Sequence, residues 1–275
     1  MRRFTAIVLM CLWPFGLAAQ DSALVSLQTA DETRGWEGVG RIDIAGRAFC
    51  TGTLIAPDIV LTAAHCLYDT ETKKNFAAND FTFLAGWRNG RAVAYRGVKR
   101  VMAHPDYRYL GPEHIEEVGR DLALLELDQP IRLASIQPFA IGSDPLLGEK
   151  VEVVSYALDR SEAPSLQRSC SVLAPQPGMT VFSCSVDFGS SGAPIFRMKD
   201  GVPEIVSVVS AKAEMEGIKV SLGVQMARPL AELRAAFDAS QDRFRKITPG
   251  TTILPQIKTL GSGAGTGAGA KFLKP

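Results

Sequence analysis

The sequence contains a histidine, an aspartate and a serine whose surroundings suit nucleophilic catalysis. His65 follows the apolar run 59–61 and directly precedes Cys66, Asp121 opens a second apolar run, and Ser191 lies in a glycine-rich turn. A serine hydroxyl is a weak nucleophile at neutral pH, so it needs a base to take its proton and a third group to orient that base. These three residue types in this setting predict the chemistry of a serine hydrolase.

His65 is the preferred general base, because the unperturbed pKa of histidine lies close to neutral pH. It lies between an apolar strand-like run and a cysteine that we expect to be cross-linked, which would hold it rigidly. Asp121 is the preferred orienting acid. The sequence leaves other candidates open, namely His104 in a turn-like stretch and His114 in a polar loop for the base, and Asp106 and Asp128 for the acid.

Ser191 is the preferred nucleophile within the run 189–194, which reads Gly-Ser-Ser-Gly-Ala-Pro. Gly189 and Gly192 would let the backbone turn sharply and approach a substrate closely. The spacing to these glycines favours Ser191 over its neighbour Ser190. A flexible Gly/Ser loop without catalytic function is the alternative interpretation.

Several runs resemble the chymotrypsin/trypsin-like serine peptidases, whose triad follows the order His, Asp, Ser. They are Leu-Thr-Ala-Ala-His-Cys at 61–66, His-Pro-Asp-Tyr at 104–107, Asp-Leu-Ala-Leu-Leu at 121–125 and the serine run at 189–194. The resemblance covers about residues 36–240. It implies an all-β fold of two six-stranded antiparallel barrels with a C-terminal helix. It also implies an oxyanion hole made by the backbone N–H groups of Gly189 and Ser191.

The resemblance predicts a serine endopeptidase that cleaves protein or peptide substrates through an acyl-enzyme and needs no cofactor or metal. The alternative is a peptidase fold kept for binding without turnover. A further hydrolase class, the α/β-hydrolases, is disfavoured because those enzymes place the histidine last and use Gly-x-Ser-x-Gly.

The chain departs from the family at the residue before the nucleophile. That position is usually an aspartate that pairs with a newly cleaved N-terminus, but here it is Ser190. The Ile-Val-Gly-Gly start is also missing, since the corresponding region reads Trp-Glu-Gly-Val-Gly-Arg at 36–41. We therefore predict activity that does not depend on such an ion pair, as in bacterial branches similar to glutamyl endopeptidases.

The sequence indicates little about which substrate side chain the primary pocket would bind. Ser185 stands where trypsin has the aspartate that binds basic side chains, although Asp187 follows two residues later. The run 209–212 resembles the strand that lines the primary pocket, so Ser210 and Lys212 are also expected to bind substrate. Lys212 would attract an acidic side chain, unless it is an ordinary solvated surface lysine.

The N-terminus predicts export. Arg2 and Arg3 precede the apolar stretch 4–17, which is short for a membrane span, and small residues follow it. Residues 1–19 are therefore interpreted as a signal peptide, which predicts a secreted or periplasmic protein without stable membrane association. The net charge is +1, from 30 basic and 29 acidic residues. With no long block of like charge, no binding to nucleic acid is expected, and a monomer is predicted.

The cysteine count supports the same compartment. Removing a signal peptide removes Cys11 and leaves an even number of cysteines, which in an exported chain favours disulfides. Pairing of neighbours, Cys50 with Cys66 and Cys170 with Cys184, is the most plausible of the possible connectivities. A zinc site is disfavoured because its usual C-x2-C spacing is absent.

Short runs rich in β-branched and aromatic residues, at 81–84, 151–154 and 205–209, predict strands, whereas 229–237 has the spacing of a helix. The expected organisation has five parts. They are the signal peptide at 1–19, an N-terminal segment or short propeptide at 20–35, a first barrel carrying His65 and Asp121 at 36–137, a second barrel carrying Ser191 and the helix at 138–240, and a tail at 241–275 that is Gly/Ala-rich and disordered from about 261.

Overall fold

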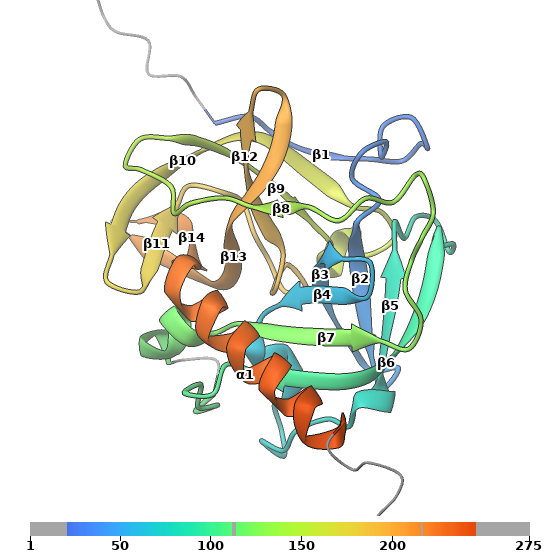
Figure 1. Ribbon diagram of the computed structural model, residues 1–275. Coiled ribbons are helices and arrows are strands. Elements are labelled where there is room, and N and C mark those ends of the chain that lie inside the picture. Colours follow the sequence, from blue (N-terminus) through green and yellow to red (C-terminus); the bar gives the residue numbers. More distant parts are fainter. Residues whose placement is uncertain (1–20, 112–113, 216, 246–275) are drawn as a thin grey trace, which may run out of the picture.

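Short antiparallel strands make up most of the chain in the computed structural model, which describes residues 21–245 except 112, 113 and 216, and side chains up to residue 240. The runs predicted to be strands lie inside strands β5 (Phe81–Ala85), β9 (Lys150–Ser155) and β13 (Val202–Met215) (Figure 1). Within this described part, no helix is both long and apolar enough to cross a membrane.

The first barrel is closed by six strands in the spatial order β2-β3-β4-β7-β6-β5. Side chains alternate between its interior and its surface, as the pleat of a strand requires. Phe81 and Phe83 are buried in the interior, whereas Thr82 between them is only half-buried. The strands are β2 (Val39–Ile44), β3 (Ala48–Ala56), β4 (Ile59–Thr62), β5 (Phe81–Ala85), β6 (Ala94–Ala103) and β7 (Ala123–Leu127).

The second barrel is closed in the same way, because β9 pairs with both β10 and β12. Two short strands add to its outside: β1 (Leu24–Ser26) pairs antiparallel with β10, and β8 (Ala140–Ile141) pairs parallel with β13. The barrel strands are β9 (Lys150–Ser155), β10 (Ser165–Gln176), β11 (Met179–Phe182), β12 (Pro194–Lys199), β13 (Val202–Met215) and β14 (Ile218–Val224). The predicted fold of two six-stranded antiparallel barrels is therefore confirmed.

The two barrels share a buried apolar core where they meet. Trp36, Phe139 and Phe196 pack their rings together there, with centroids 4.8–6.2 Å apart. The same cluster includes Leu61, which precedes the turn that carries His65, and Leu122, which directly follows Asp121. Packing at this junction therefore holds the candidate catalytic turns at the boundary between the barrels.

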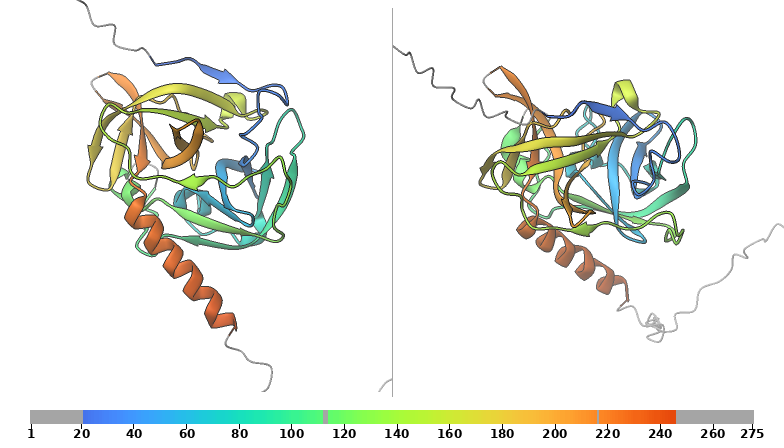
Figure 2. Two further views of the ribbon diagram at one scale, coloured as in Figure 1. Left: turned by 45° about the horizontal axis from the view of Figure 1, so that its top comes forward. Right: turned by 90° about the horizontal axis from the view of Figure 1, so that it is seen from above.

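The single described α-helix, α1 (Ala227–Arg245), follows the second barrel and packs back against β6 and β7 of the first (Figures 1 and 2). Leu230, Leu233 and Phe237 are buried, as their spacing predicts, but the helix extends beyond the predicted range 229–237. Arg100 of β6 accounts for part of this extension, because it donates to Ser240 Oγ beyond the predicted range. Its guanidinium lies 3.4 Å from the centroid of the Phe237 ring and donates to the Phe237 carbonyl at 2.7 Å.

The N-terminal segment is part of the folded domain from Asp21 onward. Asp21 lies 3.5 Å from Lys150, and the backbone N–H groups of Ser22 and Leu27 donate to carbonyls beside β10. The expected signal peptide and the tail from residue 246 lie outside the described residues. Four short 3-10 segments complete the fold, namely η1 (Ala64–Leu67), η2 (Ala78–Asp80), η3 (Ile115–Arg120) and η4 (Leu158–Arg160).

Candidate active site

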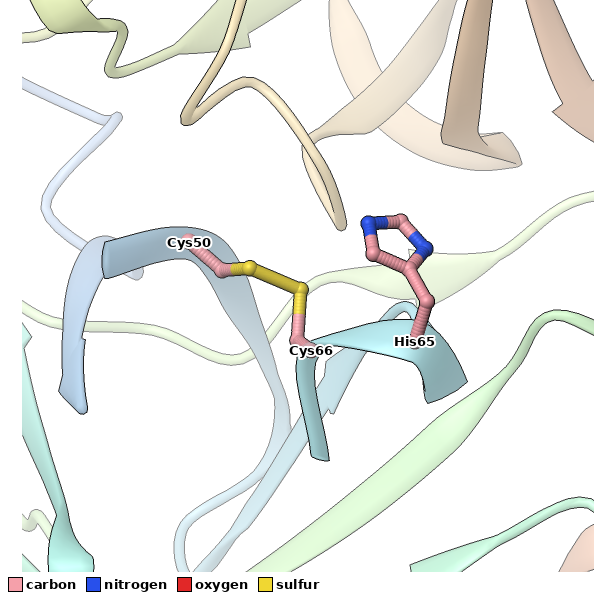
Figure 3. Close-up of side chains that lie close together, drawn as sticks. All are labelled: Cys50, His65 and Cys66. Atoms are coloured by element: carbon pink, nitrogen blue, oxygen red, sulfur yellow. A yellow bond between two sulfur atoms is a disulfide. The ribbon is translucent and has the colours of Figure 1, made fainter. Parts of the chain in front are cut away.

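His65 lies in η1, directly after β4, where the Cys50–Cys66 disulfide ties the turn to β3. Figure 3 shows the imidazole ring and this disulfide side by side on the turn. A loop of this length closed by a disulfide contributes about 3 kcal/mol in the loop-entropy model. The cross-link therefore restricts the backbone on the C-terminal side of the histidine.

Asp121 caps the C-terminal end of η3, just before β7, and only 3% of its surface is exposed. One carboxylate oxygen, Oδ1, accepts the backbone N–H of His65 at 2.8 Å. The other, Oδ2, lies 2.7 Å from His65 Nδ1. Because a carboxylate only accepts hydrogen bonds, the proton of the neutral imidazole sits on Nδ1, and Nε2 is left unprotonated to act as a base.

The electrostatics of the pair favour a more basic histidine. Burial alone would lower the pKa of His65, but the charge of Asp121 and the hydrogen bond that His65 donates to it outweigh burial and raise that pKa above its ordinary value of 6.5. A buried carboxylate therefore stabilises the imidazolium that forms when the ring takes up a proton.

A third group holds the carboxylate from the opposite barrel. Ser210 of β13 donates its hydroxyl to Asp121 Oδ2 at 2.5 Å. The Ser210 side chain is 9% exposed, so its hydroxyl is committed to Asp121. The expected substrate-binding role of Ser210 stays a prediction.

Ser191 lies in the loop between β11 and β12, and this loop turns at two glycines in the left-handed region. Gly189 has φ 93° and Gly192 has φ 79°. A Cβ on Gly189 would come within 2.3 Å of the Phe49 ring, and one on Gly192 within 2.0 Å of Thr62 Oγ1. No other residue type fits here without moving the loop, because only glycine lacks both the clash and the strain.

The backbone amides of this loop follow a selective pattern. Within the described part of the chain, the backbone N–H groups of Gly189 and Ser191 donate to no acceptor. Every other amide from 187 to 193 has an acceptor: Asp187 N–H bonds Ser190 Oγ, Phe188 N–H bonds Asp187 Oδ1, Ser190 N–H bonds the Asp187 carbonyl, Gly192 N–H bonds the Val209 carbonyl, and Ala193 N–H bonds the Ser190 carbonyl. The two available donors are the pair expected to bind an oxyanion.

Thr51 of β3 connects this loop to the first barrel. Its backbone N–H donates to the Ser191 carbonyl at 2.9 Å, and its hydroxyl donates to the Gly189 carbonyl at 2.8 Å. The same hydroxyl accepts the buried Tyr156 N–H at 3.0 Å. Thr51 was not identified from the sequence, because these partners lie more than 100 residues away from it.

The other candidates for base and acid lie apart from this site. The only described histidine bonded to Asp121 is His65, since His104 lies 3.2 Å from Glu232 and His114 lies 2.9 Å from Glu116. Asp106 donates its N–H to His104, and Asp128 donates its N–H to the Gly97 carbonyl.

Ser191 and His65 are not joined by a hydrogen bond among the described residues, although the Ser191 side chain remains half-exposed. Catalytic hydrogen bonds are often long without substrate and shorten in the reacting complex.

The expected specificity residues have partners of their own. Ser185 is exposed and donates its N–H to Gln167 at 2.8 Å. Lys212 forms an ion pair with Asp187 at 2.8 Å and lies 3.9 Å from the centroid of the Phe188 ring. This lysine is exposed, and it has an ionic and an aromatic partner. Binding of substrate by these side chains stays a prediction.

A group of possible metal ligands adjoins the site, since donor atoms of Cys50, His65 and Cys66 lie within 4.8 Å of one another. Thiolates bind metals, but these two sulfurs are joined in a disulfide. The proximity is thus explained by the cross-link. The second disulfide joins Cys170 and Cys184, which matches the pairing expected from the sequence.

Comparison with known proteins identifies the family. The sequence profile of the family described as Trypsin matches residues 28–230. This chain is a member of the trypsin family. The match includes both barrels and the turns that carry His65, Asp121 and Ser191.

Two curated relatives each match only part of this chain. A modular serine protease of Drosophila melanogaster is 36% identical over 93 residues, which is 32% of this chain and 14% of that protein. A glutamyl endopeptidase of Bacillus licheniformis is 27% identical over 151 residues, or 54% of this chain and 45% of that protein. The matched part thus spans less than half the length of either relative.

A solved structure shows the same architecture. The structure of Glu endopeptidase in complex with MPD aligns with a TM-score of 0.65 at 20% identity, and the alignment covers 80% of this chain and 98% of that chain. At this level of identity the likeness shows the fold alone, which is the chymotrypsin-like pair of barrels.

Proposed function

We propose that this member of the trypsin family is an exported serine endopeptidase with the triad His65, Asp121 and Ser191. The observation that carries the proposal is the pair of unbonded amides at Gly189 and Ser191, in a loop whose other amides from 187 to 193 all have acceptors. Two unbonded backbone donors next to a serine suit the stabilisation of an oxyanion.

The mechanism follows from the protonation states at the site. Ser191 Oγ attacks the scissile carbonyl carbon while its proton passes to His65 Nε2. The carbonyl oxygen becomes an oxyanion that accepts the N–H groups of Gly189 and Ser191. Asp121 holds the Nδ1–H of His65 and stabilises the imidazolium.

The tetrahedral intermediate then collapses to products. His65 donates its proton to the leaving amine, the C–N bond breaks, and an acyl-enzyme remains on Ser191. Water, deprotonated by the same nitrogen, attacks the ester carbonyl. The ester C–O bond then breaks, the acid is released, and His65 returns the proton to Ser191 Oγ. The chain's own residues supply every step, so no cofactor is required.

A catalytically idle binding protein is the second candidate, because Ser191 and His65 are not hydrogen bonded among the described residues. It would retain the fold but not an activated serine. The two candidates differ in whether Ser191 reacts with an electrophile, which is directly measurable.

The disulfides support the proposed compartment. Disulfides persist in oxidising environments, and this chain has two, one beside His65 and one before the Ser191 loop. With residues 1–19 as a signal peptide, the mature protein is expected in the periplasm or outside the cell. Its substrates are proteins or peptides, and it acts as a monomer.

The experiment is labelling of protein beginning at residue 20 with a fluorophosphonate, followed by mass spectrometry of the adduct. The expected result is one adduct on Ser191, lost in Ser191→Ala and in His65→Ala. Mapping distinguishes Ser191 from Ser190, whose side chain is fully buried. Native protein with both disulfides intact and no adduct would establish the idle fold instead.

A further inference from the structure

The residue before the nucleophile has an unusual set of partners in this chain. Ser190 is 0% exposed, and its hydroxyl donates to the Tyr156 carbonyl at 3.3 Å and accepts the Asp187 N–H at 3.3 Å. A third partner is a cation, because Arg160 Nη2 donates to Ser190 Oγ at 3.2 Å. A positive charge is therefore bonded to the residue next to Ser191.

Arg160 is held in place by a neighbouring serine. Its Nη1 donates to the Ser155 carbonyl at 2.8 Å, and its Nη2 donates to Ser155 Oγ at 3.1 Å. Among the described residues, no carboxylate lies within ion-pair distance of this guanidinium. Burial lowers the pKa of Arg160, which means that the position disfavours the charged form.

A half-buried cation bonded only to neutral acceptors contributes little to folding, because desolvation opposes its gain from hydrogen bonds. Packing alone would be served by an apolar side chain of similar length. The guanidinium instead donates to two different segments at once. It bonds β9 through Ser155 and the nucleophile loop through Ser190, which requires a side chain with several donors in a fork.

The short segment that carries Arg160 makes a second bond to the same loop. In η4, the backbone N–H of Leu158 donates to the Phe188 carbonyl at 2.8 Å. In a planar trans peptide, the carbonyl and the following N–H point in opposite directions. Holding the Phe188 carbonyl toward Leu158 therefore turns the Gly189 N–H to the other side, where it has no described acceptor.

We propose that Arg160 is a positioning residue that fixes the oxyanion-binding conformation of the loop through Ser190. The proposal rests on the proposed function, since it concerns the same two amides. Arg160 acts on the Ser190 end and Leu158 acts on the Phe188–Gly189 peptide, so η4 holds the loop on both sides of Gly189.

This arrangement also explains why a free N-terminus is not needed at this place. The partners of the Ser190 hydroxyl are Arg160, Tyr156 and Asp187, and none of them belongs to the N-terminal segment. That segment is engaged elsewhere, with Ser22 bonded to Ser169 at 2.8 Å. Arg160, which orders the loop, is part of the folded chain and is in place as soon as the second barrel forms.

The test compares Arg160→Ala and Arg160→Lys with wild type, in protein beginning at residue 20. Two quantities are measured, the second-order rate of fluorophosphonate labelling and the kcat and KM for p-nitrophenyl acetate. We expect Arg160→Ala to lower the labelling rate and kcat by about 10²-fold, the typical loss for one oxyanion donor, with KM nearly unchanged. Arg160→Lys keeps the charge but not the fork, so a smaller loss is expected.

Two further measurements separate positioning from simple destabilisation. Guanidinium chloride, kept well below denaturing concentrations, should restore part of the rate in Arg160→Ala. Hydrogen exchange should rise in the peptide that contains residues 185–193. The matched control is Arg100→Ala, which removes a half-buried arginine bonded to α1 and should lower stability without changing the labelling rate or responding to guanidinium.

Folded Arg160→Ala that labels at the wild-type rate would overturn the inference and leave the proposed function intact. A rate loss without rescue, with unchanged exchange at 185–193, would overturn it as well. If wild type does not label but Arg160→Ala still loosens the loop, the proposed function fails while the positioning of the loop by Arg160 stands.

Discussion

Ser210 donates a hydrogen bond to Asp121 across the boundary between the two barrels, at 2.5 Å. The same carboxylate oxygen lies 2.7 Å from His65 Nδ1. One oxygen thus receives a donor from each barrel, and its position depends on how the barrels are docked. The bond makes Ser210 a residue that orients the acid, although its position in the sequence suggested only contact with substrate.

Replacing Ser210 with alanine should lower kcat/KM by about 10-fold or more, because a hydrogen bond to a charged group is typically worth about 1.5–3 kcal/mol. The acid limb of the pH–rate profile should move to higher pH, since Asp121 without this donor interacts more strongly with the imidazolium. Ester hydrolysis measured across pH tests both effects. Ser207→Ala is the control on the same strand, because the buried Ser207 hydroxyl bonds the Val224 carbonyl and not Asp121. Equal losses in the two variants would contradict a specific role for Ser210.

The pH dependence of wild type should report the raised pKa of His65. The base works only when neutral, so kcat/KM should fall as pH decreases through a midpoint above 6.5. Asp121→Asn removes the charge that raises this pKa, so its midpoint should lie lower and its rate should drop by about 10⁴-fold. A wild-type midpoint at or below the ordinary histidine value would show that burial, not Asp121, dominates.

Thr51→Val should weaken both the loop and the junction of the barrels. The valine keeps the shape and the backbone N–H of Thr51 but leaves the Tyr156 N–H, on a fully buried residue, without its acceptor. An unsatisfied buried group costs about 1–3 kcal/mol, and the rate should fall by roughly 10-fold as the Gly189 carbonyl loses its donor. Urea unfolding and labelling rates measure the two effects. Thr51→Ser retains the hydroxyl, so a loss as large as that of valine would argue against the hydrogen bonds as the cause.

Freeing Lys212 should change the preference for acidic side chains. The ion pair with Lys212 is the main reason why the pKa of Asp187 lies below its usual range, so the two charges neutralise one another. Asp187→Asn keeps the acceptor for the Phe188 N–H and releases the lysine. We expect Asp187→Asn to improve the cleavage of peptides that carry glutamate immediately before the scissile bond by about 5-fold, relative to peptides that carry alanine there. The gain corresponds to about 1 kcal/mol of attraction between the exposed lysine and the glutamate.

A peptide library read by mass spectrometry measures this preference. The double variant Asp187→Asn with Lys212→Met should lose the gain. If Asp187→Asn alone leaves the preference unchanged, Lys212 does not face the substrate.

The residues recognised in advance are those whose signals lie close together in the sequence. His65 beside Cys66, and Ser191 between two glycines, carry their context within a few residues. The disulfides were also predictable, because each joins cysteines only 16 or 14 residues apart. Burial of Leu230, Leu233 and Phe237 followed from their helical spacing.

The contacts that could not be predicted are long-range. Ser210 lies 89 residues from Asp121, and Thr51 lies 138 residues from Gly189. Arg160 is closer to its partner, but a lone arginine in a polar loop gives no sign of where its guanidinium points. The far end of α1 was missed for the same reason, since Arg100 in the other barrel donates to Ser240 there. Such contacts depend on docking of the barrels, which local patterns do not encode.

The division of the site between the barrels also determines when a chain acquires activity. The base and its carboxylate precede residue 122, whereas the nucleophile and the donor that steadies the carboxylate come after residue 190. A partly synthesised or partly translocated chain holds a histidine and an acid with no serine to activate. Under the proposed function, such a chain cannot yet form an acyl-enzyme. Activity would arise only with the closing of the second barrel, so the order of synthesis itself delays it.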